Sequence, residues 1–351
     1  MTNILSKTPE VVVGDREAGL RGDMSALVSR IAGVLPWLIL LATMAVIFRA
    51  NDAYLFTVSI TIILWAVLAS GLNVILGYCG YYHLGLGAFY GIGAYGAALL
   101  SVKAGQPMIV PVVVMPIIAA VLGFIIGPIV LRIRGLHFAV ATLSIGMIAS
   151  DVANNWVALT GGPIGIVGIR RPPGISLGWL TLNTRSVSGM FVLACLMLVF
   201  ITGLVAYFRR TTFALVLRGI KSDELQLRSF GFKTTIYKVV AFSIAGSVAA
   251  LAGVYYAYFI QFVSPEPFSF FSASFQIFVV LAVGGPGTLW GPLLGSILLT
   301  GLPEILELDP QLKLIVYGVV LFLVIAFFPG GLSSIFETVR GRLIRRKPTP
   351  R

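Results

Sequence analysis

The sequence predicts an all-α, polytopic integral membrane protein: a bundle of about 8–10 transmembrane helices with glycine-rich broken segments. Of its 351 residues, 58% are hydrophobic and only 11% are charged, with a mean hydropathy of +0.98. Soluble domains contain about 25% charged residues. A helical span needs about 20 apolar residues, and such runs recur along the chain. Its 39 glycines favour close contacts between helices, because helices in lipid associate through small residues.

The apolar runs give ten candidate spans in chain order. They are 31–48, 54–76, 84–102, 108–131, 137–159, 187–207, 236–259, 274–286, 288–302 and 312–328. The eighth and ninth are short and interrupted by Gly and Pro, so they could form one broken or re-entrant element. GxxxG spacings at Gly87–Gly91, Gly123–Gly127 and Gly291–Gly295 are weak signals singly, but together they predict a tightly packed bundle.

Charge divides the chain into three parts: a polar tail (1–30), a membrane domain (31–332) and a basic tail (333–351). The positive-inside bias places the basic loop 208–235 and both tails in the cytoplasm. The outer loops 260–273 and 303–311 then carry acids and no Lys or Arg. Loop 160–186 is an exception to the positive-inside bias, because it is placed outside and contains three Arg. Basic residues between spans and at the C-terminus suit anionic membrane lipid. Nucleic acid is not an expected partner, because the charge forms no continuous basic face.

The loop 208–235 is long enough to form a helix that a soluble partner could bind. Its spacing predicts helical pairs between Lys221 and Glu224 and between Glu224 and Arg228. Gly231 suits the left-handed position that ends a helix. An amphipathic loop lying on the lipid surface is the alternative. The candidate coupling residues are Arg218, Lys221, Asp223, Glu224, Arg228 and Gly231.

Two glycine-rich regions, 71–100 and 283–296, interrupt the helical pattern at membrane depth. Irregular backbone is tolerated there only where protein buries it or where it lines a wet cavity. Paired interrupted segments in the two halves of a transporter point to the substrate route. Tight turns without substrate contact are the alternative. The candidate pathway residues are Asn73, Gly77, Gly80, His83, Gly85 and Gly87 in the first region and Gly284, Gly285 and Gly287 in the second.

No catalytic or metal-binding pattern is evident, and we expect neither a metal nor a cofactor nor an enzyme. His83 has no second His or carboxylate at ligand spacing. The chain contains no Gly-Lys dipeptide and therefore no phosphate-binding P-loop. Asp151 is the one acid within an apolar run, and the Asn residues that follow it indicate the outer interface. Energy for transport must then come from another subunit. An ion-coupled carrier that uses Asp151 is the alternative from a different class.

Four blocks carry a resemblance to a known family. They are GLNVILGYCGYYHLGLGAFYGIGAYGAALL at 71–100, RGLHFAVATLSIGMI at 134–148 with TGGPIGI at 160–166, RTTFALVLRGIKSDELQLRSFGFKTTIYKVVAFSIAGSVAALAGVYYA at 210–257, and FVVLAVGGPGTLWGPLLGS at 278–296 with FFPGGL at 327–332. In this order they resemble the permease subunit of branched-chain amino-acid ABC importers, of the high-affinity leucine/isoleucine/valine type.

The resemblance implies that the cytoplasmic loop forms a coupling helix, with Glu224 at its acidic position and Gly231 at its end. It also implies two cytoplasmic ATP-binding subunits, a homologous second permease subunit, a periplasmic substrate-binding protein and a place in the bacterial inner membrane. Phe213-Ala214 departs from the more common Phe-Gly, which leaves the start of the helix open. Alternating access would then move branched-chain amino acids, while urea, short-chain amides or other amino acids are the alternative substrates.

Overall fold

The computed structural model describes residues 37, 40–133, 135–172, 174–177, 180–182, 184–305, 310–327 and 330–333. The chain divides into two units, 1–52 together with 338–351 and, separately, 53–337. In the first unit the described helix is Leu40–Ala50, which covers the second half of the expected span 31–48. The polar tail 1–30, Arg134 and residues 334–351 of the basic tail lie outside the described residues.

Within the second unit, five described helices are long and apolar enough to cross a membrane. The fold class predicted from composition is therefore confirmed. Each of the five lies within a few residues of an expected span. They are α2 (Ala53–Leu72, continued by the π-helical Asn73–Gly77), α4 (Ile109–Val130), α5 (Leu136–Asn155), α7 (Val187–Phe208) and α9 (Thr234–Ile260).

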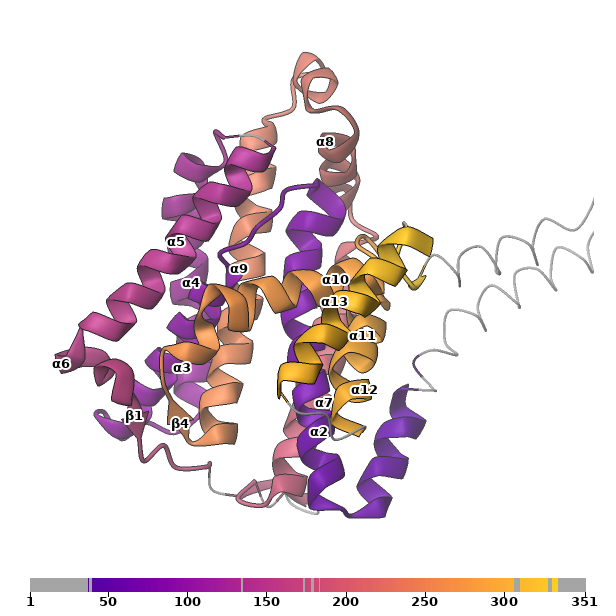
Figure 1. Cartoon of the computed structure of the whole chain (residues 1–351). Helices are drawn as coiled ribbons and strands as arrows, with labels where there is room; N and C mark the ends of the chain where they lie inside the picture. Colours follow the sequence, from indigo (N-terminus) through magenta and orange to yellow (C-terminus); the bar gives the residue numbers. More distant parts are fainter. Residues whose placement is uncertain are drawn as a thin grey trace, which may run out of the picture. The chain divides into compact units, whose positions relative to one another are not determined.

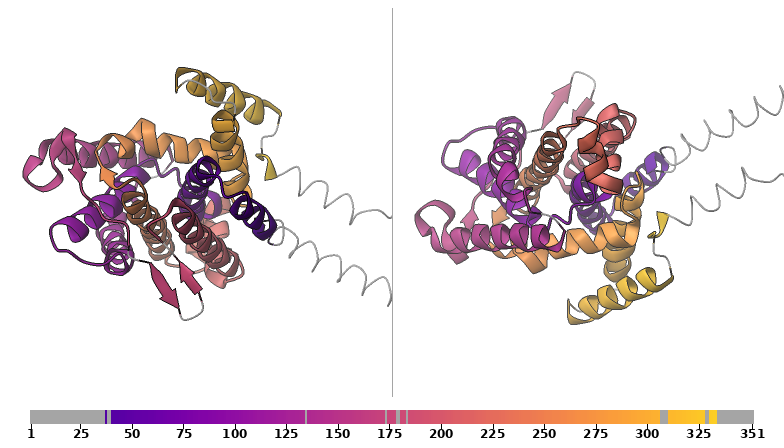
Figure 2. Two further views of the ribbon diagram at one scale, coloured as in Figure 1. Left: turned by 90° about the horizontal axis from the view of Figure 1, so that it is seen from below. Right: turned by 90° about the horizontal axis from the view of Figure 1, so that it is seen from above.

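Shorter helices occupy the remaining expected spans. They are α3 (Leu86–Val102), α10 (Gln276–Gly284) after π-helical Phe270–Phe275, α11 (Gly291–Ser296) with π-helical Ile297–Gly301 and α12 (Leu302–Ile305), and α13 (Pro310–Phe327). Figures 1 and 2 show that the stretch 270–284 runs across the long helices. The predicted span 274–286 thus corresponds to a short apolar helix that crosses the long ones (Figure 1). Its glycine-rich sequence, which already suggested a broken element, also ends this helix at Gly284.

The two ends of this unit differ in structure. Helix α8 (Thr212–Ser229) stands at one end, and the strands lie at the other (Figure 1). Strand β1 (Ile166–Val167) pairs antiparallel with β4 (Phe262–Val263), and β2 (Ile175–Leu177) pairs with β3 (Leu180–Leu182). The short α6 (Val157–Thr160) and the 3-10 turns Gly162–Ile164 and Glu266–Phe268 complete that end. The loops expected inside and outside are thus separated by the length of the long helices.

Helix α9 lies at the centre of the unit and packs against α3 and α4. Its small residues allow the close approach: a Cβ on Gly253 would overlap the backbone of α3, and one on Gly93 would overlap the backbone of α9. Of the GxxxG pair in α4, a Cβ on Gly123 would overlap Ser243 of α9, while Gly127 faces the side chain of Val239 at an ordinary contact distance. Because lipid offers no hydrophobic drive for helix association, these backbone contacts hold the helices together through dispersion.

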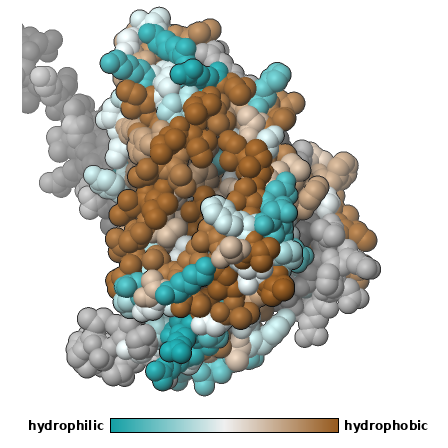
Figure 3. All heavy atoms as spheres, turned by 90° about the vertical axis from the view of Figure 1, so that its left-hand side faces the viewer, coloured by the Kyte–Doolittle hydropathy of each residue, from teal (hydrophilic) through white to brown (hydrophobic). Residues whose placement is uncertain are grey.

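The outer face of α4 and α5 is apolar. Large side chains such as Ile117, Ile125 and Ile148 are more than half exposed. Figure 3 shows this face as a broad hydrophobic area, with hydrophilic residues gathered mostly toward its upper and lower ends. An exposed apolar surface of this extent is stable only against lipid or another apolar protein surface.

Candidate functional site

Helix α8 is two helices joined at Asp223. This residue has φ −156° and ψ 102°, outside the helical region. Its Oδ1 accepts hydrogen bonds from the N–H groups of Leu225 (2.9 Å) and Gln226 (3.0 Å). Asp223 is therefore an N-cap in mid-sequence, and the short second helix stands out as the topmost turn in Figure 1. The first helix is capped by Thr211, whose side chain accepts from Ala214 N.

The second helix ends as the sequence predicted. Gly231 has φ +85°, and its N–H donates to Arg228 O (2.9 Å) while the N–H of Phe232 donates to Leu227 O (3.2 Å). These two bonds form a Schellman cap, which requires a left-handed residue at this point. Residues 224–229 are thus a helix of fixed length with a side-chain cap at one end and a glycine cap at the other.

Glu224 is the centre of a cluster of polar groups at the base of this short helix. Its Oε1 accepts from Lys238 Nζ (2.9 Å), Thr234 Oγ1 (2.9 Å) and Arg228 Nη2 (2.6 Å). Its Oε2 accepts from the Tyr81 hydroxyl (3.0 Å). The Lys238 ammonium, 1% exposed, also donates to Tyr81 Oη (2.9 Å) and to Leu131 O (3.3 Å). The Glu224 carboxylate therefore joins α8 to α9 and to the segment after α2, and its partner Lys238 extends the cluster to Leu131 at the end of α4.

The environment of Glu224 keeps it ionised. Burial of the carboxyl would raise its pKa, but the hydrogen bond and charge of Lys238, with the bonds from Thr234 and Tyr81, outweigh burial and lower the pKa to about 2. The pair is an ion pair at neutral pH, and it is mostly removed from solvent. Such a pair fixes geometry because neither partner can leave without exposing the other as an unpaired buried charge.

The first helix of α8 contacts the end of the α2 segment. Lys221 Nζ donates to the carbonyl oxygen of Gly77 (2.9 Å), where the π-helical turn ends. A cation at the last carbonyls of a helix interacts favourably with the helix dipole. The Arg218 guanidinium lies over the ring of Tyr78, 5.3 Å from its centroid. The expected i,i+3 pair between Lys221 and Glu224 is interrupted by the non-helical Asp223, whereas the Glu224–Arg228 pair forms.

Residues 80–85 run as non-helical backbone from the α8 end into the unit, where α3 begins (Figure 1). Gly80 adopts φ +79° against the side chain of Lys221. The N–H of Leu84 donates to Thr142 Oγ1 of α5 (3.0 Å), and the N–H of Gly87 donates to Ser274 Oγ (2.9 Å). A Cβ on Gly85 would overlap the Thr142 carbonyl. Protein therefore satisfies this irregular backbone at membrane depth.

His83 lies inside this segment and is buried. Its Nδ1 accepts from the N–H of Gly85 (3.3 Å), and its ring lies 4.5 Å from that of Phe242. The other ring nitrogen has no hydrogen-bond partner among the described residues. No group of three potential metal ligands occurs in the part of the chain that the structure describes. The His83 ring is therefore packed among apolar side chains within the irregular segment.

Asn73 joins the two glycine-rich regions, which are more than 200 residues apart in sequence. Its Nδ2 donates to Thr288 O (2.7 Å), and its Oδ1 accepts from the N–H of Gly287 (2.7 Å). Asn73 is fully buried. A Cβ on Gly77 would overlap both Asn73 Oδ1 and the Gly287 backbone. One amide thus holds the turn 285–290 against the end of the α2 segment.

The second region is a tight hairpin of α10 and α11. A Cβ on Gly284 would overlap the backbone of Gly291, and Gly285 (φ +110°) leaves the helical region to turn the chain. Gly331 packs on Gly285, and the N–H of Leu332 donates to Val283 O (2.9 Å). The eighth and ninth expected spans are therefore two short helices joined by a turn, and Gly331 and Leu332 of the FFPGGL motif pack on that turn.

The predicted coupling residues thus touch the first glycine-rich region, and that region touches the second. Lys238, Thr234 and Tyr81 were not among the site residues predicted from the sequence. A signal for Lys238 was present, because it is a lone cation five residues into the apolar helix α9, and ionisable residues in such helices are functional by default. Asp151 has an exposed side chain one turn before the end of α5, which agrees with an interfacial position.

The tip of α8 presents apolar side chains to solvent. Leu225, Phe230 and Phe232 are 66%, 71% and 40% exposed. They sit beside the exposed cations Arg228 and Lys233. Large apolar groups among charges on a capped, rigid helix are typical of a protein-binding surface.

Comparisons with known proteins agree with this arrangement. The family model described as the permease component of the branched-chain amino acid transport system matches residues 54–325. The high-affinity branched-chain amino acid transport system permease protein LivM is 30% identical in Salmonella typhimurium and 31% identical in Escherichia coli. Each match covers 287 residues, 77% of this chain and 67% of the relative. The autoinducer 2 import system permease protein LsrC of Salmonella typhi is 30% identical over 60% of each chain. No solved structure matches at a significant level.

Proposed function

This chain belongs to the family of permease components of branched-chain amino acid transport systems, and we propose that it is the membrane subunit of an ABC importer for branched-chain amino acids. Two cytoplasmic ATP-binding subunits drive it, a homologous second permease subunit completes the membrane part, and a periplasmic protein delivers the substrate. It spans the bacterial inner membrane with both termini in the cytoplasm. The sequence contains no P-loop motif.

The observation that carries this proposal is the short helix 224–229. It is capped at both ends, exposes Leu225 and Phe230, and is anchored by Glu224 to a buried lysine of α9. A rigid helix end that exposes Leu225 and Phe230 beside basic residues is suited to bind in a groove of a soluble subunit. Its anchors lead to the broken segments through Lys221 and Asn73. A push on α8 would therefore move the hairpin of α10 and α11, as rigid-body switching requires.

The substrate is proposed from similarity to named relatives and from the size of the cavity described below. LivM, by name, is a permease of branched-chain amino acid transport, and its similarity covers more of this chain than that of LsrC. Urea, short-chain amides and autoinducer 2 are alternative substrates. An ion-coupled carrier is disfavoured because Asp151 is exposed at a helix end, and because the ionised Glu224 is held by Lys238 at the α8 end.

The test is reconstitution of the whole importer in vesicles with ATP inside and the binding protein outside. We expect ATP-dependent leucine uptake that persists with a protonophore, and little uptake of urea. Leu225→Asp and Phe230→Asp should each abolish co-purification with the ATP-binding subunits and abolish uptake. Val167→Asp, at an equally exposed apolar position on β1 at the opposite end, is the matched control and should keep both.

Uptake that follows an ion gradient in the absence of the ATP-binding subunits would contradict the proposed class. ATP-driven uptake of urea but not leucine would contradict the substrate alone. Intact binding of the ATP-binding subunits by both α8 variants would contradict the role of the short helix.

A further inference from the structure

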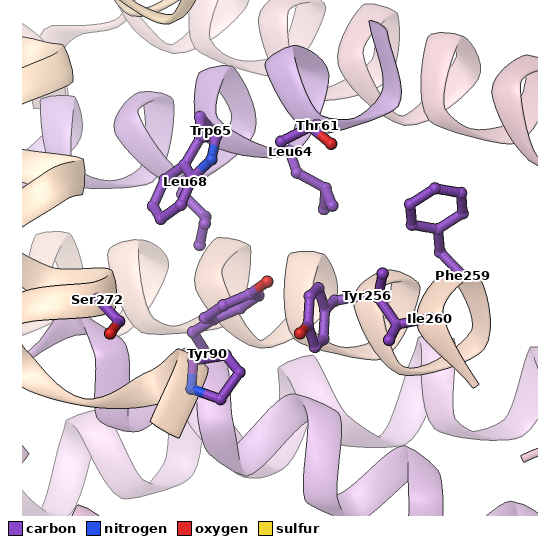
Figure 4. A pocket seen from close by; sticks show the side chains of 10 residues that line it. Thr61, Leu64, Trp65, Leu68, Tyr90, Tyr256, Phe259, Ile260 and Ser272 are labelled. Atoms are coloured by element: carbon purple, nitrogen blue, oxygen red, sulfur yellow. The ribbon is translucent and has the colours of Figure 1, made fainter. Parts of the chain in front are cut away.

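A cavity of about 240 Å³ lies in the half of the unit far from α8, between α2, α3, α9 and the segment that precedes α10 (Figure 4). It is smaller than the roughly 300–1,000 Å³ of sites for drug-sized ligands, which suits a single amino acid. Its lining residues are Thr61, Leu64, Trp65, Leu68, Tyr90, Tyr256, Phe259, Ile260, Pro267 and Ser272.

The chemistry of the lining is apolar and aromatic, with hydroxyl groups and no charge. Leu64 and Leu68 form an aliphatic wall on α2, and the rings of Tyr90 and Tyr256 meet edge to face with centroids 5.6 Å apart. Neither tyrosine hydroxyl is hydrogen-bonded to another described residue. Aromatic faces attract an ammonium group, and hydroxyls can donate to a carboxylate.

These features select among ligands. A branched aliphatic side chain gains by leaving water for the leucine wall. A zwitterion finds aromatic faces and hydroxyl donors but no fixed charge that would hold it tightly, which suits a site that must release its ligand. Urea, in contrast, would lose most of its hydrogen bonds to water in such a lining.

The walls of the cavity are connected to α8. Helices α2 and α3 are joined by the segment 77–85, whose first residues contact Lys221 and Glu224. The ring of Tyr90 packs on Phe268 (4.9 Å), and Gly87 next to it is bonded to Ser274. The cavity therefore lies between the first glycine-rich region, through Tyr90, and the segment that precedes α10. Along α9, Tyr256 is about 27 Å from Lys238 at 1.5 Å per residue. Motion of α8 would therefore displace the helices that form the walls of the cavity.

We propose that this cavity is the chamber in which the importer holds a branched aliphatic amino acid during translocation. The proposal rests on the proposed function and assigns its substrate site. The side chain lies against Leu64, Leu68 and Trp65, and the ammonium and carboxylate groups lie near the rings and hydroxyls of Tyr90 and Tyr256. ATP-driven movement of the segment 77–85 opens this cavity toward the cytoplasm.

The test uses one reversible obstruction in the reconstituted importer. Thr61→Cys is made in a background of Cys79→Ala and Cys195→Ala, which removes the two free cysteines. A benzyl methanethiosulfonate then attaches a ring to residue 61, and a reducing agent removes it from the same folded sample. Thr57→Cys is the matched control, because Thr57 lies one turn earlier on α2, is exposed, and also bonds the carbonyl four residues before it.

We expect complete labelling at residue 61 to lower ATP-driven uptake of radiolabelled leucine by at least about tenfold, equal to a barrier increase of about 1.4 kcal/mol. Reduction should restore uptake, and ATP hydrolysis by the labelled complex should continue. The same label at residue 57 should leave uptake unchanged. Undiminished uptake after labelling at 61, equal loss at 57, or a cysteine at 61 that the reagent cannot reach would each overturn the proposal. If the unlabelled importer takes up no leucine, the proposed function fails first.

Discussion

Replacing Glu224 by Gln should destabilise the protein strongly, because it leaves the Lys238 ammonium buried without a counter-charge. Lys238 is 1% exposed and would keep only Tyr81 Oη and Leu131 O as neutral acceptors. Breaking a buried ion pair by removing one partner costs about 3–5 kcal/mol. The Gln oxygen can still accept a hydrogen bond, so we expect the lower end, about 3 kcal/mol.

The pKa of Glu224 gives a second estimate of the same quantity. A carboxyl whose pKa falls from 4.5 to about 2 on folding gains about 3 kcal/mol relative to its protonated form. The side chain is 11% exposed, so solvent screens this interaction only partly. Both lines of reasoning give a loss of the same order.

Lys238→Met should cost less, about 1–2 kcal/mol, because the carboxylate keeps Arg228 and some solvent. In the double variant the two losses should not add, and a coupling energy of about 2 kcal/mol is expected for groups in direct contact. The assay is the free energy of unfolding of the purified permease, measured by titrating mixed micelles with a denaturing detergent. Asp151→Asn is the control, since its exposed carboxylate should change stability by less than about 0.5 kcal/mol.

Two results would refute this reasoning. One is a loss below about 1 kcal/mol for Glu224→Gln, which would mean that water or a rearranged neighbour solvates Lys238. The other is additivity within about 0.5 kcal/mol in the double-mutant cycle, which would mean that the two charges act independently.

Other predictions follow from single contacts. Gly231→Ala should cost about 1–2 kcal/mol because an alanine must adopt a left-handed φ there, and circular dichroism melting should show the loss; an unchanged midpoint would exclude the Schellman cap. Asn73→Leu should cost about 1–3 kcal/mol by leaving two half-buried backbone groups, Gly287 N–H and Thr288 C=O, unpaired, whereas Ser70→Ala, a local change one turn away, should cost under about 1.5 kcal/mol. The Glu224 contribution should be constant from pH 7 to about 5 and disappear as pH falls from 4.5 toward 2, because its pKa is lowered on folding; stability that rises in this range would contradict the ion pair.

The sequence by itself determined the class of this protein, most of its helix positions and, through Gly231, the C-terminal end of the helix in the loop 208–235. These features are local. A long apolar run must be helical in lipid because its backbone has no other hydrogen-bond partners. Gly231 signals a helix end because only glycine adopts its φ easily. The basic loop and the two glycine-rich regions were likewise visible as composition along the chain.

Only the tertiary structure decided which of these features touch one another. Asn73 binds residues 214 and 215 positions away, and the partner of Glu224 is a lysine 14 residues on, across a helix end. The direction of 270–284, the break at Asp223 and the cavity beside Tyr90 also depend on packing between distant segments. Hydropathy and spacing carry no information on such pairs, because a side chain in a sequence has no fixed neighbour until helices pack. The sequence thus predicted the basic loop and the two glycine-rich regions separately, and the tertiary structure showed that they are in contact.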